Sequence, residues 1–276
     1  MTALSAPARG GSSLRWLLSD ALVFTRRNFE HTRQLPERLI EVTIQPVMFV
    51  LLFAYVFGGA IAIPGGSYRE YLMAGILVQS LAFGLMGPAI KIAADLNEGV
   101  IDRFLSLPTS RLSYLLGHVI AEMSGMALAT AVLSVTGLIV GWRTHAGIEE
   151  VIGAYALLML FSASMVWAGT LIGLFVRSTD AVAGVVFTFI FPLTFLSSAF
   201  VPIETLPKIL EYFAAYNPIS VLIAAVRDLW GNPTAPISHS VWPLEHPLIA
   251  SIGWCAGILA IVVPLTLVRF RQRTST

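Results

Sequence analysis

The chain has 276 residues and is 56% hydrophobic, but only 12% of its residues are charged, and its mean hydropathy is +0.79. A soluble domain carries about 25% charged residues, so this chain has too little charge to cover a water-facing surface and is expected to lie in lipid. Its net charge of +1 provides no bulk positive field for nucleic acid, and its single cysteine, Cys255, excludes an internal disulfide.

The N-terminal region is predicted to lie outside the bilayer core. Residues 1–13 are small and polar, with Gly, Ser and Pro, which predicts a disordered tail without the apolar core of a signal peptide. Residues 14–33 place apolar side chains at i, i+3 and i+4 spacing and most arginines on other faces. This pattern predicts an amphipathic helix in the membrane interface, and a surface helix of a small cytoplasmic domain is the alternative.

Six apolar segments follow, each close to the roughly 20 residues that cross a bilayer as a helix. They cover about residues 41–63, 71–93, 113–141, 151–176, 181–201 and 248–268. Residues 14–276 are therefore predicted to form one all-α membrane domain. If both termini are cytoplasmic, thirteen of the 17 basic residues lie on the cytoplasmic side and four outside, as the positive-inside rule requires.

The segment between the second and third spans, residues 98–111, is the only polar stretch of any length between two long apolar runs in the first half of the chain. Its spacing predicts a short amphipathic helix over about residues 98–108, ended by Pro108. In the predicted orientation this helix is cytoplasmic and can press its apolar face into a soluble partner; a solvated loop is the alternative. The apolar residues recur every three or four positions and are Val100, Ile101, Phe104, Leu105 and Leu107.

The chain contains no recognisable motif for binding ATP or a metal. A P-loop needs a lysine after a glycine-rich turn, and neither Lys91 nor Lys208, the two lysines of the chain, has that context. The five histidines have no metal-ligand spacing. We therefore expect no enzyme activity from this chain on its own, no metal and no cofactor bound by it.

Three features within the spans have both a functional and a packing interpretation. His118 and Glu122 lie one turn apart on the third span and would share a face, either as a structural pair near the interface or as a proton or substrate site. Small residues every four positions on that span allow close packing, within the subunit or across a dimer. A bulky face on the first span can line a route for a lipophilic substrate or pack against other helices. The small residues are Gly117, Ala121, Gly125 and Ala129, and the bulky ones include Met48, Phe49, Phe53 and Phe57.

Residues 202–247, between the fifth and sixth spans, have intermediate polarity and face outward in the predicted orientation. An apolar stripe opposes Glu204, Lys208 and Glu211, which predicts one short amphipathic helix. A break at residues 216–218 separates it from a second short helix that ends near Trp230. Two helices that re-enter the outer leaflet over about residues 202–230 fit this pattern, and a folded external loop is the alternative. The stripe consists of Leu206, Ile209, Leu210 and Phe213.

Four stretches of the chain resemble the ABC-2 type permeases, the membrane subunits of ATP-binding-cassette exporters. Residues 98–108, EGVIDRFLSLP, resemble the cytoplasmic coupling segment of that family. Residues 195–230 resemble its signature around the outer re-entrant helices. Residues 45–59 and the opening Pro36-Glu37-Arg38 resemble the daunorubicin/doxorubicin-resistance branch, a branch of drug exporters.

The resemblance implies six membrane helices, an N-terminal interfacial helix and a dimer of permeases, a homodimer in the simplest case. It implies two copies of a separate ATPase subunit, which bind ATP and Mg, and a location in the bacterial cytoplasmic membrane. The residues implied in ATPase coupling are Glu98, Gly99, Ile101, Asp102, Arg103, Phe104, Leu105, Pro108 and Arg111. Those implied in the outer re-entrant segment are Leu206, Phe213, Asn217, Pro218 and Arg227.

The expected function is export of a lipophilic or amphiphilic substrate, such as a drug, an antibiotic or a lipid-like metabolite. An exporter of a polysaccharide or glycolipid is the alternative within the family. From other classes, the alternatives are a non-transporting scaffold and an intramembrane enzyme, for which the spans offer only His118 and Glu122 as a plausible pair.

Overall fold

The computed structural model describes residues 44, 47–58, 63, 66–105, 111–176, 178–234 and 241–273. The predicted tail, residues 1–13, the predicted interfacial helix, residues 14–33, and Pro108 lie outside these ranges. Within them, the side chains that are not described are those of Phe57, Asp102, Phe104, Leu105 and Arg111.

The described residues are almost entirely helical, and they form no β-strand beyond an isolated bridge between Ile63 and Gly66. The first apolar helix covers Val47–Val56 and runs into a π-helical turn, η1 (Phe53–Phe57). The elements that follow in chain order are α3 (Tyr68–Phe83), α4 (Met86–Asn97), α5 (Val100–Leu105), α6 (Arg111–Val140), α7 (Ile148–Phe175), α8 (Thr179–Phe195), η2 (Ile203–Thr205), α9 (Lys208–Tyr216), α10 (Pro218–Trp230), α11 (Trp242–Glu245) and α12 (Pro247–Arg273).

Among the described residues, four helical segments are long and apolar enough to cross a membrane: Tyr68–Asn97, Leu112–Val140, Ile148–Phe175 and Pro247–Arg273. They correspond to the second, third, fourth and sixth predicted spans. The first and fifth predicted spans coincide with shorter apolar helices, Val47–Val56 and Thr179–Phe195. The prediction of a helical membrane protein is therefore confirmed, whereas the count of six spans stays a prediction.

The second predicted span is one continuous segment in the sequence but two helices in the structure. The chain turns at Gly84 and Leu85, where the Leu85 amide donates to Ala82 O, three residues back instead of four. Helix α7 packs directly against this break, because a Cβ atom added to Gly169 would lie 2.1 Å from Leu85 O. The break therefore lies at a site of close contact between α7 and the start of α4, and the composition of the span does not reveal it.

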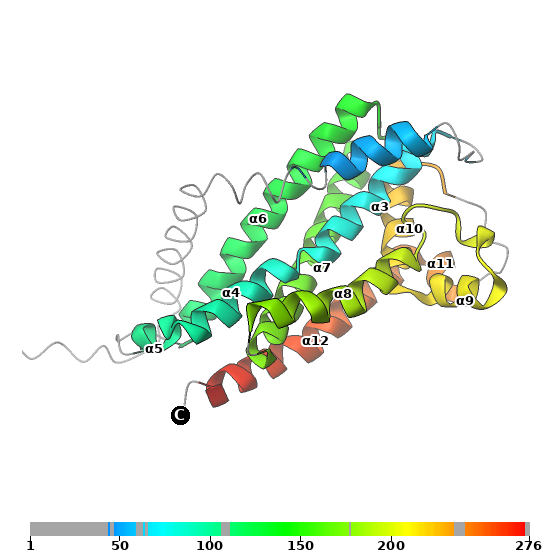
Figure 1. Cartoon of the computed structure of the whole chain (residues 1–276). Coiled ribbons are helices and arrows are strands. Elements are labelled where there is room, and N and C mark those ends of the chain that lie inside the picture. Colours follow the sequence, from blue (N-terminus) through cyan, green and yellow to red (C-terminus); the bar gives the residue numbers. More distant parts are fainter. Residues whose placement is uncertain are drawn as a thin grey trace, which may run out of the picture.

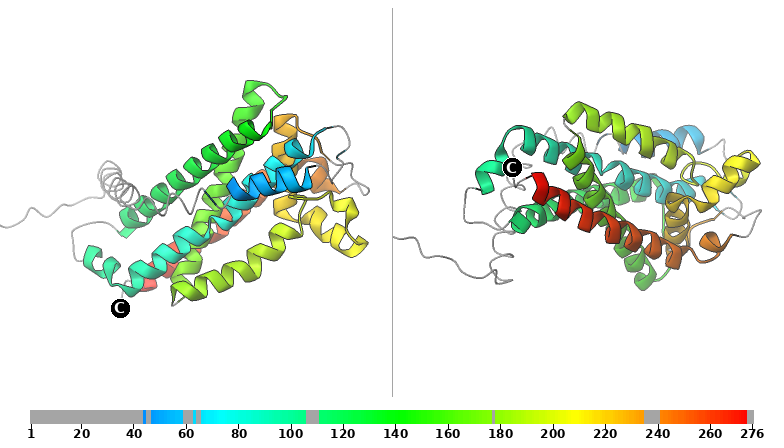
Figure 2. Two further views of the ribbon diagram at one scale, coloured as in Figure 1. Left: turned by 45° about the horizontal axis from the view of Figure 1, so that its top comes forward. Right: turned by 90° about the horizontal axis from the view of Figure 1, so that it is seen from below.

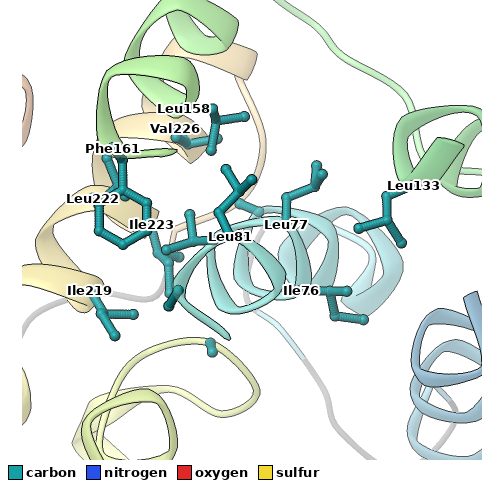
Figure 3. Close-up of a cluster of buried hydrophobic side chains, with 14 of the residues drawn as sticks. Ile76, Leu77, Leu81, Leu133, Leu158, Phe161, Ile219, Leu222, Ile223 and Val226 are labelled. Atoms are coloured by element: carbon teal, nitrogen blue, oxygen red, sulfur yellow. The ribbon is translucent and has the colours of Figure 1, made fainter. Parts of the chain in front are cut away.

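Helix α3 lies at the centre of the main apolar core. Ile76, Leu77 and Leu81 project from it between α6 on one side and α7 and α10 on the other (Figure 3). The facing side chains in that view are Leu133 of α6, Leu158 and Phe161 of α7, and Ile219, Leu222, Ile223 and Val226 of α10. A helix covered on several sides fits an apolar segment with little amphipathic pattern.

The predicted small-residue stripe of α6 does not make the closest helix contact of the described bundle. Gly125 has no atom within 4 Å of the position a Cβ would take, whereas a Cβ on Gly173 of α7 would lie 2.4 Å from Ala89 O of α4. Close backbone approach therefore occurs between α4 and α7. The open side of Gly125 leaves the predicted role of the stripe in a dimer untested.

The elements sort to the two ends of an elongated bundle (Figures 1 and 2). Helix α5 and the C-terminal part of α12 lie at one end, here called the α5 end. Helices α9, α10 and α11 lie at the other, here called the α10 end. The described parts of the two segments with a predicted function, residues 98–105 and 202–230, therefore lie at opposite ends of the bundle.

Candidate functional site

Helix α5 is positioned by a turn with a left-handed residue. Helix α4 ends at Asn97, and the Glu98 amide closes it by donating to Ala94 O at 2.9 Å. Gly99 then has φ +64°, a conformation that a residue with a side chain adopts only with strain. Helix α5 is therefore separate from α4 and covers Val100–Leu105, so it begins two residues after the start of the helix predicted over residues 98–108. The predicted end of that helix lies outside the described residues.

Ile101 of α5 is buried in an apolar cluster with one residue from each of four membrane helices. Its side chain is 2% exposed. Its partners are Ile92 of α4, Leu115 of α6, Leu174 of α7 and Phe270 of α12. The cluster, here called the Ile101 cluster, fastens α5 to all four helices. Ile101 thus faces the bundle, while the side chains of Glu98 and Arg103 are exposed.

Polar and aromatic contacts surround the Ile101 cluster. The Tyr114 ring of α6 stacks on Phe270 with centroids 5.9 Å apart, and its hydroxyl donates to a carboxylate oxygen of Asp95 on α4. Nearby, the Arg269 guanidinium lies 4.7 Å from the centroid of the Phe175 ring. These contacts join the same helices as the cluster. Phe270, near the end of the chain, is a member that sequence reasoning missed because nothing local marks it.

His118 and Glu122 of α6 do not pair with each other. His118 is 2% exposed, and neither of its ring nitrogens has a hydrogen-bond partner among the described residues. Glu122 instead forms an ion pair with Lys91 of α4, with Nζ and Oε1 3.6 Å apart. The predicted structural pair within one helix is therefore wrong, because the carboxylate reaches a cation on the neighbouring helix. A proton or substrate site at these two residues stays a prediction. No sequence pattern marks Lys91 as the partner of Glu122, because the two residues lie on different helices.

The bulky face of the first apolar helix is divided between packing and exposure. Phe53 stacks between Phe49, at 5.8 Å, and Phe200, at 4.5 Å between ring centroids. Met48 is 56% exposed, and the side chain of Phe57 lies outside the described part of the chain. Packing therefore accounts for Phe53, and a substrate path along this face stays a prediction.

At the α10 end, Asn217 defines the bend between α9 and α10. The axes of these two helices differ by 68°. The Asn217 side-chain amide donates to Leu193 O at 2.6 Å and to Leu196 O at 2.8 Å, and its Oδ1 accepts the Ile219 amide at 2.9 Å. One side chain thus satisfies the last carbonyls of α8 and caps α10, whose first residue is Pro218.

The predicted apolar stripe of α9 has two different environments. Leu206 packs against a small cluster formed by Ile203, Ala214 and Ala215. Phe213 is 65% exposed, so in a membrane it would face lipid or another protein. The neighbouring Glu204 has a raised pKa, because burial disfavours its charged form and the carboxylate of Glu211 adds repulsion.

Arg227 of α10 is buried and ties together three parts of the chain. Its Nε donates to Tyr71 O of α3 at 3.0 Å, and its Nη2 donates to Ser198 O, after α8, at 2.8 Å. Its guanidinium carbon also lies 3.4 Å from the centroid of the Tyr71 ring, whose hydroxyl donates to Ser198 O at 3.0 Å. The sequence marks Arg227 as a motif residue, but it does not reveal that its partner is Tyr71, which is 156 positions away.

A second set of contacts holds the loop between α6 and α7 to the end of α10. Trp142 donates through Nε1 to Asn232 Oδ1 at 2.8 Å, and Asn232 donates to Arg143 O at 2.8 Å. The Trp142 ring meets Trp230 edge-on, with centroids 4.8 Å apart. His145 of the same loop lies 2.9 Å from a Glu70 carboxylate oxygen of α3. The α10 end is thus joined by directional polar contacts.

The part of the chain that the structure describes contains no group of three or more His, Cys, Asp or Glu side chains that could hold a metal ion. The arrangement is instead that of a polytopic helical membrane protein, with a short helix fastened at one end and a bent helix pair at the other.

Comparison with known proteins identifies the class more closely. Residues 20–229 match the family model described as the ABC-2 type transporter, so the chain belongs to this family. The chain is 28% identical to the daunorubicin resistance ABC transporter permease protein DrrB1 of Streptomyces coeruleorubidus, over 99% of this chain and 93% of that protein. It is 26% identical to the doxorubicin resistance ABC transporter permease protein DrrB of Mycobacterium tuberculosis, over 81% and 80% of the two chains.

A third relative extends the range of organisms. The putative transport permease ycf38 of Cyanophora paradoxa is 24% identical over 89% of this chain and 86% of its own length. These matches confirm the resemblance to ABC-2 permeases and to the daunorubicin/doxorubicin-resistance branch. The chain is thus a multi-pass membrane permease component of an ABC transporter, a class of transporter that implies an ATPase partner.

Proposed function

We propose that this chain is the permease subunit of an exporter that moves a lipophilic or amphiphilic substrate outward across the bacterial cytoplasmic membrane. Relatives named for resistance to daunorubicin and doxorubicin support a drug, an antibiotic or a lipid-like metabolite as the substrate. The absence of a P-loop in the sequence supports ATP hydrolysis on a separate subunit, with ATP and Mg bound there.

We place the α5 end in the cytoplasm and both termini on that side. The thirteen-to-four asymmetry of basic residues supports this orientation. Two permease copies and two ATPase subunits are the proposed assembly, since one chain with a few spans encloses only a small pathway. The open space beside Gly125 leaves room on α6 for the close approach of a second copy's helix.

The burial of Ile101 is the observation that supports α5 as the coupling helix. Free energy released on a soluble ATPase reaches the membrane only through an element that is exposed to the ATPase and attached to the helices that move. Glu98, just before α5, and Arg103, within it, are exposed, and the inward face of α5 joins four membrane helices through the Ile101 cluster.

The proposed coupling mechanism assigns different parts to the residues of this segment. Phe104 and Leu105 would anchor in an apolar groove of the ATPase, where buried aromatic anchors typically contribute about 2 kcal/mol or more. Glu98, Asp102 and Arg103 would form rim pairs, each worth less than about 1 kcal/mol. Movement of the ATPases would displace α5 and, through Ile101, shift α4, α6, α7 and α12 relative to the α10 end.

Replacement of Phe104 by Ala tests this assignment. Phe104→Ala should leave the permease inserted and folded but weaken co-purification of the ATPase and reduce substrate efflux from cells at least tenfold, since about 2 kcal/mol is lost. Phe189→Ala is the matched control, because Phe189 is an exposed ring on α8, away from α5. It should retain both the ATPase and efflux, and Asp102→Asn should have a smaller effect than Phe104→Ala. Parental ATPase binding and efflux in Phe104→Ala would contradict the coupling role.

A further inference from the structure

A cavity of about 110 Å³ lies at the α10 end, beside the buried Arg227. Its wall combines side chains from α3, from the turn after α8, from α10 and from the start of α12. The lining includes Ser198, Ser220, Arg227, Asp228 and Pro247. The cavity lies far from α5, so the proposed coupling role does not account for it.

The Arg227 guanidinium has no anionic partner among the described residues. Two of its five N–H groups donate, to Tyr71 O and Ser198 O, and both acceptors are neutral carbonyls. The side chain is nevertheless 2% exposed. A buried cation that is not neutralised costs free energy, and an anion bound in the cavity would offset that cost.

Two hydroxyl groups beside the cavity lack an acceptor. Ser198 Oγ is buried and has no hydrogen-bond partner among the described residues. Ser220 Oγ accepts the Ser198 amide at 3.1 Å, and no acceptor for its own hydrogen is found in the described chain. Arg227 and the two serines therefore supply a guanidinium and two hydroxyl donors, a set that matches the oxygens of a phosphate group.

A second cavity, of about 370 Å³, adjoins the first and shares Asp228 and Pro247 with it. Asp228 is exposed and forms no ion pair in the described chain, and Glu150 adds a second carboxylate to the lining. The rest of this lining is largely apolar and includes Leu248 and Ile249, both exposed on α12. The first cavity thus holds hydrogen-bond donors for an anion, carboxylates for a cation lie where the two cavities meet and in the second cavity, and the rest of the second cavity is largely apolar.

We propose that the two cavities bind the head group of a membrane phospholipid that carries both a phosphate and a primary ammonium group. The phosphate lies against Arg227, Ser198 and Ser220. The ammonium group lies at Asp228, where the cavities meet, and the acyl chains leave along Leu248 and Ile249. The carboxylate of Asp228 disfavours a head group that has only negative charge. This binding goes beyond the transport function and needs no ATPase.

The test measures lipid binding to the purified, delipidated full-length permease by native mass spectrometry. The probes are phosphatidylethanolamine and phosphatidylglycerol with identical acyl chains, and soluble phosphoethanolamine as the head group alone. We expect phosphatidylethanolamine to bind more tightly than phosphatidylglycerol and phosphoethanolamine to bind weakly. Ser198→Ala removes a hydroxyl that has no partner in the protein, so it should leave the fold intact and weaken both lipids about tenfold.

Asp228→Asn separates the two parts of the site. It should weaken phosphatidylethanolamine about twofold to fivefold, as for an exposed ion pair, and leave phosphatidylglycerol unchanged or tighter. Ser124→Ala and Asp180→Asn are matched controls on α6 and α8, away from both cavities, and should bind as the parent does.

Three results would overturn the inference. They are equal binding of the two lipids by the parent, an unchanged lipid preference in Asp228→Asn, and parental binding by Ser198→Ala. Binding of phosphoethanolamine as tight as that of the whole lipid would assign the site to a soluble ligand instead. Because no ATPase or efflux enters the measurement, these results would leave the proposed transport function unaffected.

Discussion

The two ends of the bundle are held together by different kinds of contact. At the α5 end, the Ile101 cluster joins α5 to four helices through apolar side chains, with the Tyr114–Asp95 hydrogen bond beside it. At the α10 end, Asn217 and Arg227 bind backbone carbonyls of other elements through hydrogen bonds of 2.6–3.0 Å. Apolar packing thus predominates at the α5 end, whereas directional hydrogen bonds add to the apolar packing of α10 at the other end.

This difference indicates which end can move. Apolar contact depends on the area buried and not on direction, so helices packed in this way can shift while remaining covered. Hydrogen bonds weaken steeply when their angle or length changes, so an end that depends on them keeps its geometry. We infer that displacement of α5 by an ATPase tilts the membrane helices about the α10 end, which acts as the fixed point.

The largest effect should follow from removal of the Phe270 ring at the α5 end. Phe270→Ala should lower the free energy of unfolding by about 3–5 kcal/mol, because it leaves a cavity in the Ile101 cluster. Phe270→Leu keeps the site apolar and fills part of the space, so it should cost less than Phe270→Ala although it loses the stacking on Tyr114. Unfolding of the purified permease in detergent, followed by circular dichroism, measures both. Equal stability of Phe270→Ala and the parent would show that the cluster does not hold this end.

A smaller loss should follow from changes to Asn217 at the α10 end. Asn217→Ala removes one helix cap and two donors to carbonyls, at about 1 kcal/mol each, for a total of about 3 kcal/mol. Asn217→Asp keeps the cap but sets a carboxylate against Leu193 O and Leu196 O, so this close isostere should cost about 2 kcal/mol or more. The same unfolding measurement applies. Parental stability of Asn217→Asp would show that hydrogen-bond chemistry does not fix this end. The two ends would then no longer differ in how they respond to a conservative substitution.

The smallest effect should come from Glu204, whose pKa is raised in the folded protein by burial and by the carboxylate of Glu211. Because the folded state then holds its proton more tightly than the unfolded state, stability falls as the pH rises from the usual titration range of Glu through the higher folded pKa. Glu204→Gln should remove this fall and raise stability at neutral pH by no more than about 1 kcal/mol, with no gain at acidic pH. Melting temperatures of both proteins across this pH range provide the test. A gain from Glu204→Gln that did not depend on pH would contradict this account.

Much of the class and the element order could be predicted from the sequence, because these properties depend on neighbouring residues. Long apolar runs with little charge indicate membrane helices. The polar segment at residues 98–111 marks a short helix between two spans, and Asn217 with Pro218 marks the boundary between α9 and α10. Proline, capping residues and hydrophobic periodicity act within about one helical turn, so they can be read from one stretch of chain.

Tertiary structure decided what these elements contact. Sequence periodicity places Ile101 on the apolar face of α5, but only the fold brings Leu174 and Phe270 to it from distant helices. Glu122 pairs with Lys91 of α4 and not with His118 on its own helix. Arg227 depends on Tyr71, which is 156 positions away. Such partners are chosen by the packing of whole helices, because burial favours the pairing of a charge or polar group with a complementary group that a neighbouring helix presents.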